Sequence, residues 1–373
     1  MTKISGRVAI LRDGIEIGSL NCIDTSVKYN SKAKVKRACQ IKCKSKENMK
    51  SYYQKEYDFL FPSDDVFPGE NMFLVGNEYV KKKYVFDKMK DRLKVYLNKD
   101  GTEYSLGVFM IISAPKSDNG KLEEYSFECY DETMKLEQNQ IEERLFFAKG
   151  TSQLSAINKI LVDLGFMLII SDDSSALLQN DREWEMGTNV LDIVNELLKE
   201  INFCDFHINS EGYVKLIKKC QKDNADFVYK KGKFSIIVPD TTEKIDVYKI
   251  PNIFVGTVSN PDTPNMYFKI VNDRLDSPVS TINRGFPIRK TYKLDNIASQ
   301  DELEEFIKNE FNNSLQQTES ITFSTEQEAM HEFESVVQVE TNNIKGLYVE
   351  IDWSINLGVN GDMKHTAERK VFI

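Results

Sequence analysis

The sequence predicts a mainly β fold with a small α+β insert in the middle of the chain. Apolar and polar residues alternate over the first 133 residues or so, and Asp-Gly or Asn-Gly pairs separate the alternating runs. The hydrophobic period changes to that of a helix near residue 150 and returns to two near residue 227. At 373 residues, with 41% hydrophobic and 29% charged, the chain is typical of soluble multidomain proteins. We place the domain boundaries at 1–133, 134–226 and 227–373.

The first block reads as several long strands joined by tight turns. Asp13-Gly14 and Asp100-Gly101 each separate two alternating runs, and Asn119-Gly120 leads into a further one. These dipeptides accept the positive φ angles of two-residue hairpin turns, so the block is predicted to be an antiparallel barrel or sandwich. Residues 45–90, which are rich in Lys, Tyr and Phe, are predicted to be an extended loop or hairpin.

The middle block predicts two helices followed by a hairpin. Ser152 is a candidate N-cap for a helix whose apolar residues recur every three or four positions, and Gly165 stands where a left-handed C-cap is expected. A second helix is predicted to begin near Thr188, and a turn at 209–212 separates two short strands. The result is a small α+β domain.

The last block predicts strands again, interrupted by one helix over 299–315. That helix opens with the capping box Ser299 to Glu302. The clearest strand is 347–357, whose odd positions are all apolar, and we expect Val349, Ile351, Trp353 and Ile355 to face a core.

Charge is distributed unevenly along the chain. The total is 49 basic against 58 acidic residues, a net charge of −9, yet residues 28–55 hold ten basic residues and one acid. An alternating pattern there favours a half-buried strand with a solvated lysine face. A docking surface for a protein partner and a nucleic-acid site are two further interpretations. The candidate docking residues are Lys32, Lys34, Lys36, Lys42 and Lys44.

No pattern in the sequence predicts an active site. The histidines His207, His331 and His365 are far apart, and His331-Glu332 does not continue into a zinc-hydrolase motif. Serine-hydrolase, phosphate-loop and dinucleotide motifs do not occur. The six cysteines include no C-x-x-C pair and are expected to be reduced, buried thiols. We therefore expect no enzyme activity, no cofactor and no metal.

Several stretches together resemble phage tail baseplate hub proteins. They include late control protein D, XkdQ-like hubs and the N-terminal module of tail-associated proteins. The stretches are Leu106–Pro115, Glu124–Asp131, Gly150-Thr-Ser, Pro251-Asn252, Asp276–Ser280, Ser299–Leu315 and Gly346-Leu-Tyr.

The resemblance implies two tail-tube-like β-barrels per chain and a homotrimer that adapts a hexameric tail tube to a trimeric spike. It also implies contacts with the tail tube protein, a spike or needle, other baseplate proteins and a tape measure protein. The resemblance further implies that the protein assembles in the host cytoplasm and takes its place in the virion tail. It implies neither a membrane-spanning segment nor nucleic acid as a partner. The last predicted strand lies at the end of the chain, so no appended enzyme is expected. Two alternatives stay open: a peptidoglycan-cleaving tail enzyme, and a nucleic-acid-binding protein that uses residues 28–55.

Overall fold

The computed structural model of the chain describes residues 4–45, 87–118, 123–219, 224–232, 236–238, 241–245, 248–258, 265–294, 299–358 and 361–372. Strands make up 49% of the structure and helices 16%, so the predicted mainly β class is confirmed. The predicted Asn119-Gly120 turn and nearly all of the loop predicted at 45–90 lie outside the described residues.

The first block is an antiparallel array around one core. The predicted Asp13-Gly14 turn is present with φ angles of 51° and 78°, and Asp100-Gly101 has 54° and 89°. Each pair therefore occupies the left-handed region that a tight hairpin turn requires. The strands are β1 (Ile4–Arg12), β2 (Ile15–Leu20), β3 (Cys22–Asn30), β4 (Arg37–Ser45), β5 (Arg92–Lys99), β6 (Thr102–Ser113), β7 (Lys116–Asp118) and β8 (Glu123–Tyr130).

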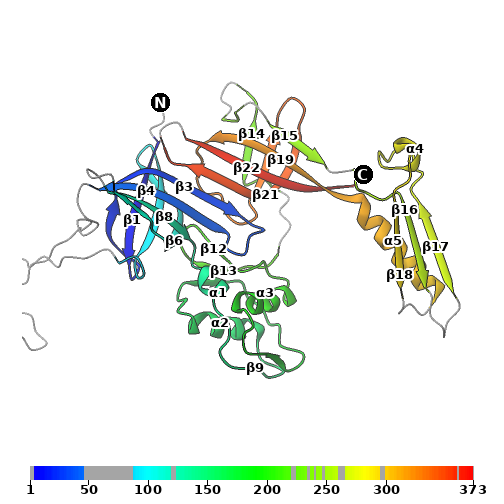
Figure 1. Cartoon of the computed structure of the whole chain (residues 1–373), viewed down its shortest axis with the longest axis horizontal. Helices are drawn as coiled ribbons and strands as arrows, with labels where there is room; N and C mark the ends of the chain where they lie inside the picture. The colour runs from blue at the N-terminus through cyan, green and yellow to red at the C-terminus, as the bar shows by residue number, and fades with distance from the viewer. Residues whose placement is uncertain are drawn as a thin grey trace, which may run out of the picture.

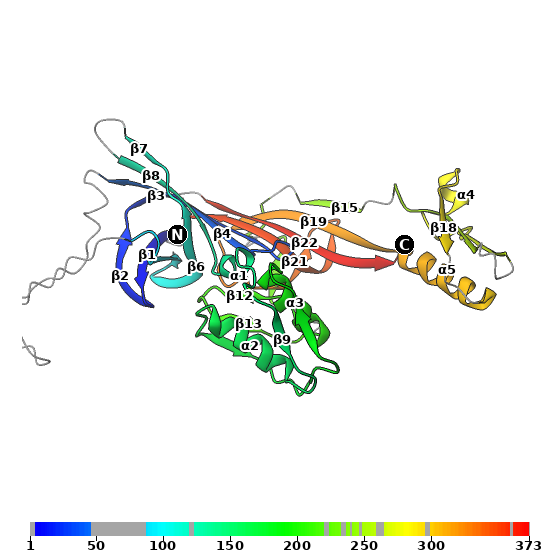
Figure 2. The same cartoon turned by 60° about the horizontal axis from the view of Figure 1, so that its bottom comes forward.

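The middle unit lies below the large sheet (Figures 1 and 2). Its first long helix is capped as predicted: the Ser152 hydroxyl accepts from the Ser155 backbone N, and Gly165 has φ 81°. The N-cap of the second long helix is Asn189, one residue after the predicted start. The elements are α1 (Met134–Glu137), β9 (Leu145–Phe147), α2 (Gln153–Asp163), β10 (Ile169–Ser171), β11 (Arg182–Trp184), α3 (Val190–Glu200), β12 (His207–Ile208) and β13 (Val214–Leu216). The predicted hairpin is the antiparallel pair β12–β13.

The last block divides into two parts. One part extends the large sheet and consists of β14 (Phe227–Lys230), β15 (Thr242–Ile245), β19 (Gln316–Glu326), β20 (Val336–Glu340), β21 (Lys345–Asn356) and β22 (Asp362–Phe372). The other is a separate three-stranded sheet packed on a helix, at the far end of the molecule in Figure 1. It contains β16 (Ile253–Val258), β17 (Met266–Val271), α4 (Thr281–Arg284), β18 (Arg289–Leu294) and α5 (Gln300–Leu315). None of the described helices is long and apolar enough to cross a membrane.

Hydrogen bonds join the two β blocks into one 14-stranded sheet. The connection is the antiparallel pair β3–β21, where Asp352 lies opposite Asn30 and Asn356 opposite Ser26. Among the described residues this sheet ends at β15 and β2 and does not close. The expected count of two barrels is therefore not confirmed; the blocks lie edge to edge within one chain (Figure 2).

The alternation predicted for 347–357 is wrong in its first half. Leu347 and Val349 are 40% and 38% exposed, whereas Tyr348 and Glu350 are buried. The reason is a β-bulge: Glu350 pairs with Ala367 and Asp352 with Thr366, so Ile351 is an extra residue on β21. An extra residue reverses which side chains face inward. Trp353 and Ile355, beyond the bulge, face the core of the first block as predicted.

Two substitutions on β21 test this reversal. We expect Trp353→Ala to lower the free energy of unfolding by about 3 to 5 kcal/mol, because it empties a core position. Leu347→Ala, which the sequence pattern placed on the same face, should lower it by less than about 1 kcal/mol. Urea unfolding measures both, and equal losses would contradict the bulge.

Candidate functional site

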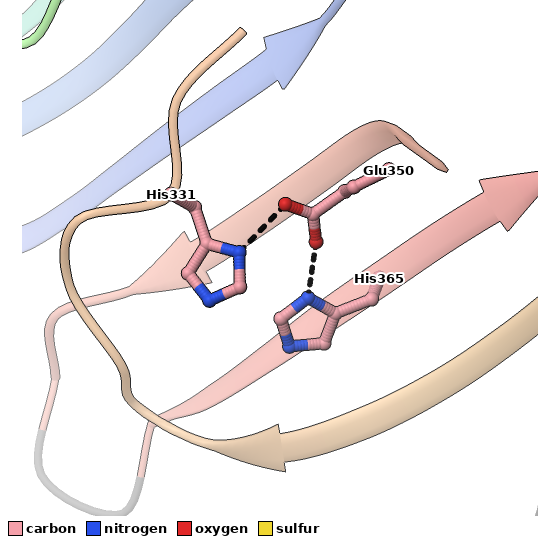
Figure 3. A group of neighbouring side chains, drawn as sticks. All are labelled: His331, Glu350 and His365. Atoms are coloured by element: carbon pink, nitrogen blue, oxygen red, sulfur yellow. Dashed lines mark hydrogen bonds and ion pairs between the residues drawn. The ribbon is translucent and has the colours of Figure 1, made fainter. Parts of the chain in front are cut away.

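Two buried polar groups lie close together, one inside the last β block and one where the units of the chain meet. The first consists of His331, in the segment between β19 and β20, Glu350 on β21 and His365 on β22. Nδ1 of His331 lies 2.6 Å from Oε2 of Glu350, and Nδ1 of His365 lies 2.6 Å from Oε1 (Figure 3). His331 and His365 are far apart in the sequence and share no motif, but β21–β22 pairing and the β19–β20 segment bring them together.

Burial sets the electrostatics of this group. It lowers the pKa of His331 to about 4, lowers that of His365, and raises that of Glu350. These residue types can hold a metal ion, and their ligand atoms all lie within 4.8 Å of one another. The expectation that the chain binds no metal stays a prediction; the sequence spacing of the histidines did not indicate that they meet, since spacing reports only local motifs.

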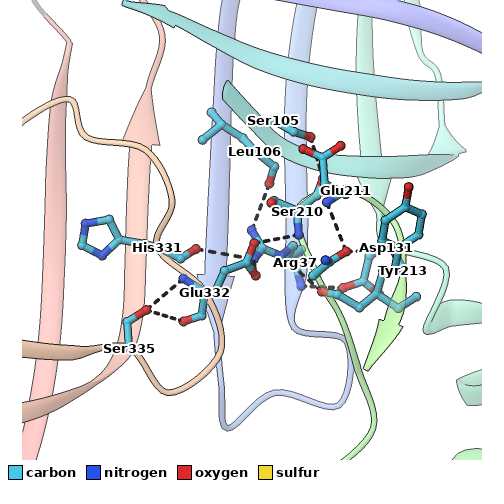
Figure 4. Close-up of polar contacts among 12 residues, drawn as sticks. Arg37, Ser105, Leu106, Asp131, Ser210, Glu211, Tyr213, His331, Glu332 and Ser335 are labelled. Atoms are coloured by element: carbon cyan, nitrogen blue, oxygen red, sulfur yellow. Dashed lines mark hydrogen bonds and ion pairs between the residues drawn. The ribbon is translucent and has the colours of Figure 1, made fainter. Parts of the chain in front are cut away.

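The second group surrounds Arg37, the first residue of β4. Its guanidinium is 1% exposed and donates to backbone carbonyls of two different units, Leu106 O at 3.0 Å on β6 and Ile208 O at 3.4 Å on β12. It also pairs with the carboxylate of Glu332, in the β19–β20 segment (Figure 4). One buried cation thus contacts the first block, the α+β unit and the last block.

Glu332 extends this connection. Its second carboxylate oxygen accepts from the Ser210 backbone N at 2.9 Å, in the β12–β13 turn. The Ser210 carbonyl in turn accepts from the Ser105 hydroxyl of β6 at 2.6 Å. The Arg37 guanidinium also lies 5.3 Å from the ring centroid of Tyr29 and 5.6 Å from that of Trp353, within cation–π range.

The five candidate lysines do not form one surface. Lys32 and Lys34 lie in the β3–β4 turn and not on a strand, and they pair with Glu368 of β22 and Asp192 of α3. Lys36 is 5% exposed and donates to the backbone oxygens of Ser31 and Ala33, so its assignment to a solvated face is wrong. Lys42 and Lys44 are exposed on β4, as predicted.

The physical reason is the length of the strand. β4 begins at Arg37, so the alternation read across 32–44 is strand periodicity only from Arg37 onward. The lysines of the preceding turn form ion pairs and hydrogen bonds with other groups of the same chain. In the sequence Arg37 looks like one more charge of the basic run. It is, however, the only arginine in 28–55, and this difference from the lysines is the signal that could have indicated its role at the junction.

His207 of β12 completes the junction. Its ring stacks on Phe333 with centroids 4.1 Å apart, and Lys36 Nζ lies 5.4 Å from the same phenyl centroid. Burial, together with Lys36 and Arg37, lowers the pKa of His207 to about 4. The third histidine is therefore neutral and structural at neutral pH.

Replacement of the buried cation should separate the units. We expect Arg37→Met to lower the free energy of unfolding by about 3 kcal/mol, because Glu332 and the carbonyls of Leu106, Ile208 and His331 lose their donor. Arg7→Met is the matched control: Arg7 pairs with Glu16 and Glu103 at the surface, so its loss should cost less than about 1 kcal/mol. Urea unfolding measures both, and similar losses for the two variants would contradict the role given to Arg37.

His207 should make stability depend on pH. Unfolding returns its pKa from about 4 to about 6.5, so the unfolded state binds the extra proton and stability falls as pH drops through this window. Between pH 7 and pH 5 this group should cost about 2 kcal/mol. His207→Asn, which keeps a side-chain donor, should lose that part of the pH dependence. Urea unfolding at pH 7 and at pH 5 measures this change in the free energy of unfolding. An equal change in the variant and in the wild type would refute the prediction.

No protein-family model matches the sequence, and no curated protein matches it. Solved structures are similar over the whole chain. A tail protein from Neisseria meningitidis MC58 aligns with 98% of this chain and 97% of its own, at 11% identity and a TM-score of 0.57. The prophage MuSo2 43 kDa tail protein from Shewanella oneidensis aligns with 97% of this chain and 98% of its own, at 9% identity and a TM-score of 0.58.

A chain of the lidded Francisella PdpA–VgrG complex is also similar. It aligns with 99% of this chain and 53% of its own length, at 12% identity and a TM-score of 0.51. The chain therefore has the fold of phage tail proteins, in agreement with the family that its sequence motifs resemble.

Proposed function

We propose that this chain is a structural baseplate hub of a phage tail or a phage-tail-like contractile particle. In this proposal three copies close into a ring that adapts a hexameric tail tube to a trimeric spike. The observation that carries it is the similarity to two tail proteins along nearly the full length of both partners. A second support is the edge-to-edge arrangement of two β blocks in one chain, because such a unit repeated three times gives six blocks around an axis.

The partners in this proposal are further copies of the chain, the tail tube protein, a spike or needle protein and other baseplate proteins. The particle assembles in the host cytoplasm and the chain takes its place in the virion tail. The role is mechanical and needs no catalytic residue or cofactor.

The mass of the full chain in solution tests the ring. Native mass spectrometry or light scattering should give three times the chain mass, either alone or after mixing with the tube and spike proteins of the same particle. Stable ring junctions typically bury about 1,200 to 2,000 Å² each. A chain that stays monomeric under both conditions would refute the trimeric hub.

We also propose that Lys42 and Lys44 contact an acidic surface of a tail partner. Both are exposed on one strand, and exposed charges steer association while contributing little to folding stability. The double variant Lys42→Gln, Lys44→Gln should remain folded and lower the yield of complete particles in a complementation assay. The control Lys218→Gln, Lys219→Gln removes the same charge from the α+β unit. Equal particle yields from the two variants would refute the docking role.

A further inference from the structure

Glu350 is a buried carboxylate that contacts no arginine or lysine in the part of the chain that the structure describes. Its side chain is 0% exposed, and among the described residues the contacts of its two oxygens are Nδ1 of His331 and Nδ1 of His365. A buried charge is stable in a protein only when a counter-charge or a metal ion compensates it. The compensating positive charge here is therefore either a proton on the cluster or a metal cation.

The hydroxyl of Thr325 is the outer partner of His365. It donates to the Glu326 carbonyl at 2.7 Å and lies 2.8 Å from Nε2 of His365. The two ring nitrogens of His365 therefore contact Thr325 on one side and Glu350 on the other, so the ring is held with Nδ1 toward the carboxylate.

Aromatic rings enclose both imidazoles. Phe323 stacks on the His365 ring at 4.6 Å, and Phe227 stacks on the His331 ring at 3.8 Å. Two imidazole nitrogens therefore face one buried carboxylate in an otherwise apolar enclosure. This is a donor set that a divalent cation can occupy by displacing the shared protons.

We propose that His331, Glu350 and His365 form a buried structural site for Zn²⁺ or a similar first-row divalent ion. The donors would be one nitrogen from each histidine and both carboxylate oxygens, a set that Zn²⁺ accepts with bonds of about 2.0 to 2.2 Å. The ligand atoms lie within 4.8 Å of one another, so small side-chain rotations close the site. This proposal is independent of the hub function.

The outer hydrogen bonds suit this assignment. Nε2 of His331 lies 2.9 Å from the Tyr229 hydroxyl, and Nε2 of His365 lies beside Thr325. Metal-binding histidines usually donate their second ring N–H to such a partner, which fixes the ring orientation. Where Nδ1 of His331 carries the proton in the metal-free protein, that proton moves to Nε2 on binding, and the ring stays neutral.

A bound cation would join three segments at the bulge of β21. The β19–β20 segment, β21 and β22 each supply one residue, and all three residues are buried. A site enclosed in this way is structural, because a catalytic zinc needs a position that water or substrate can reach.

Metal content of the full chain tests the proposal. We expect protein from Zn²⁺-supplemented medium to contain one equivalent by mass spectrometry, to lose it on unfolding with a chelator and to regain it on refolding with Zn²⁺. Refolding with Co²⁺ should give the visible absorption bands of a four-coordinate site. Wild-type protein that holds no metal both as purified and after refolding would overturn the proposal and leave a proton as the counter-charge.

Variants separate the cluster from other metal binding. Glu350→Gln keeps the side-chain shape, removes the charge and should bind no metal. His207→Asn removes the histidine outside the cluster and should keep one equivalent. Thr325→Val should weaken binding by about ten- to a hundredfold through the loss of the outer hydrogen bond. Equal metal content in Glu350→Gln and wild type would overturn the assignment; should this variant not fold, the Thr325→Val affinity decides, and an unchanged value overturns it.

Discussion

The burial of the Arg37 guanidinium is the constraint on which the arrangement of the chain depends. A guanidinium can leave water only where acceptors replace its hydration, and here the acceptors come from β6, from β12 and from the segment before β20. Each of these units supplies one part of what the cation requires. The α+β unit and the last β block are therefore held against β4 by polar geometry as well as by apolar contact, and Glu332 extends the same connection to the β12–β13 turn.

β21 provides apolar contacts at this junction because its side chains pack into two hydrophobic cores. Tyr348, before the bulge, packs with Tyr229, Phe323 and Val337, whereas Trp353, beyond it, packs with the first block. One edge of β21 changes partner at the same place, from β20 to β3, while β22 follows the other edge. The bulged Ile351 offers its carbonyl to the Ser31 backbone N at 2.8 Å. The bulge thus lets one strand serve both blocks and anchors the turn that precedes Arg37.

The sequence predicted what depends on near neighbours in the chain. The turns at Asp13-Gly14 and Asp100-Gly101 and the caps at Ser152 and Ser299 are set by local side-chain and backbone chemistry, and the structure contains them. The apolar pattern of 347–357 could not reveal an extra residue, since both faces of β21 carry apolar side chains. Lys36 and Arg37 look alike in a basic run but lie in a buried junction, and His331 meets His365 only through strand pairing. Such contacts between distant segments leave no periodic signal in a single sequence.

The open ends of the large sheet connect the fold to the proposed ring. Among the described residues the hydrogen-bonded order ends at β2 and at β15, and an edge strand presents unpaired N–H and C=O groups. In a ring of three chains with two β blocks each, three of the six junctions lie within chains and three lie between them. The β3–β21 pair already forms the first kind, by backbone hydrogen bonds from Ser26 to Asn30. The junctions between copies would have to satisfy the remaining edges or faces in a different way, because β3 and the second half of β21 are already paired on both sides. The threefold symmetry of the proposed hub would thus arise from this difference between two kinds of junction.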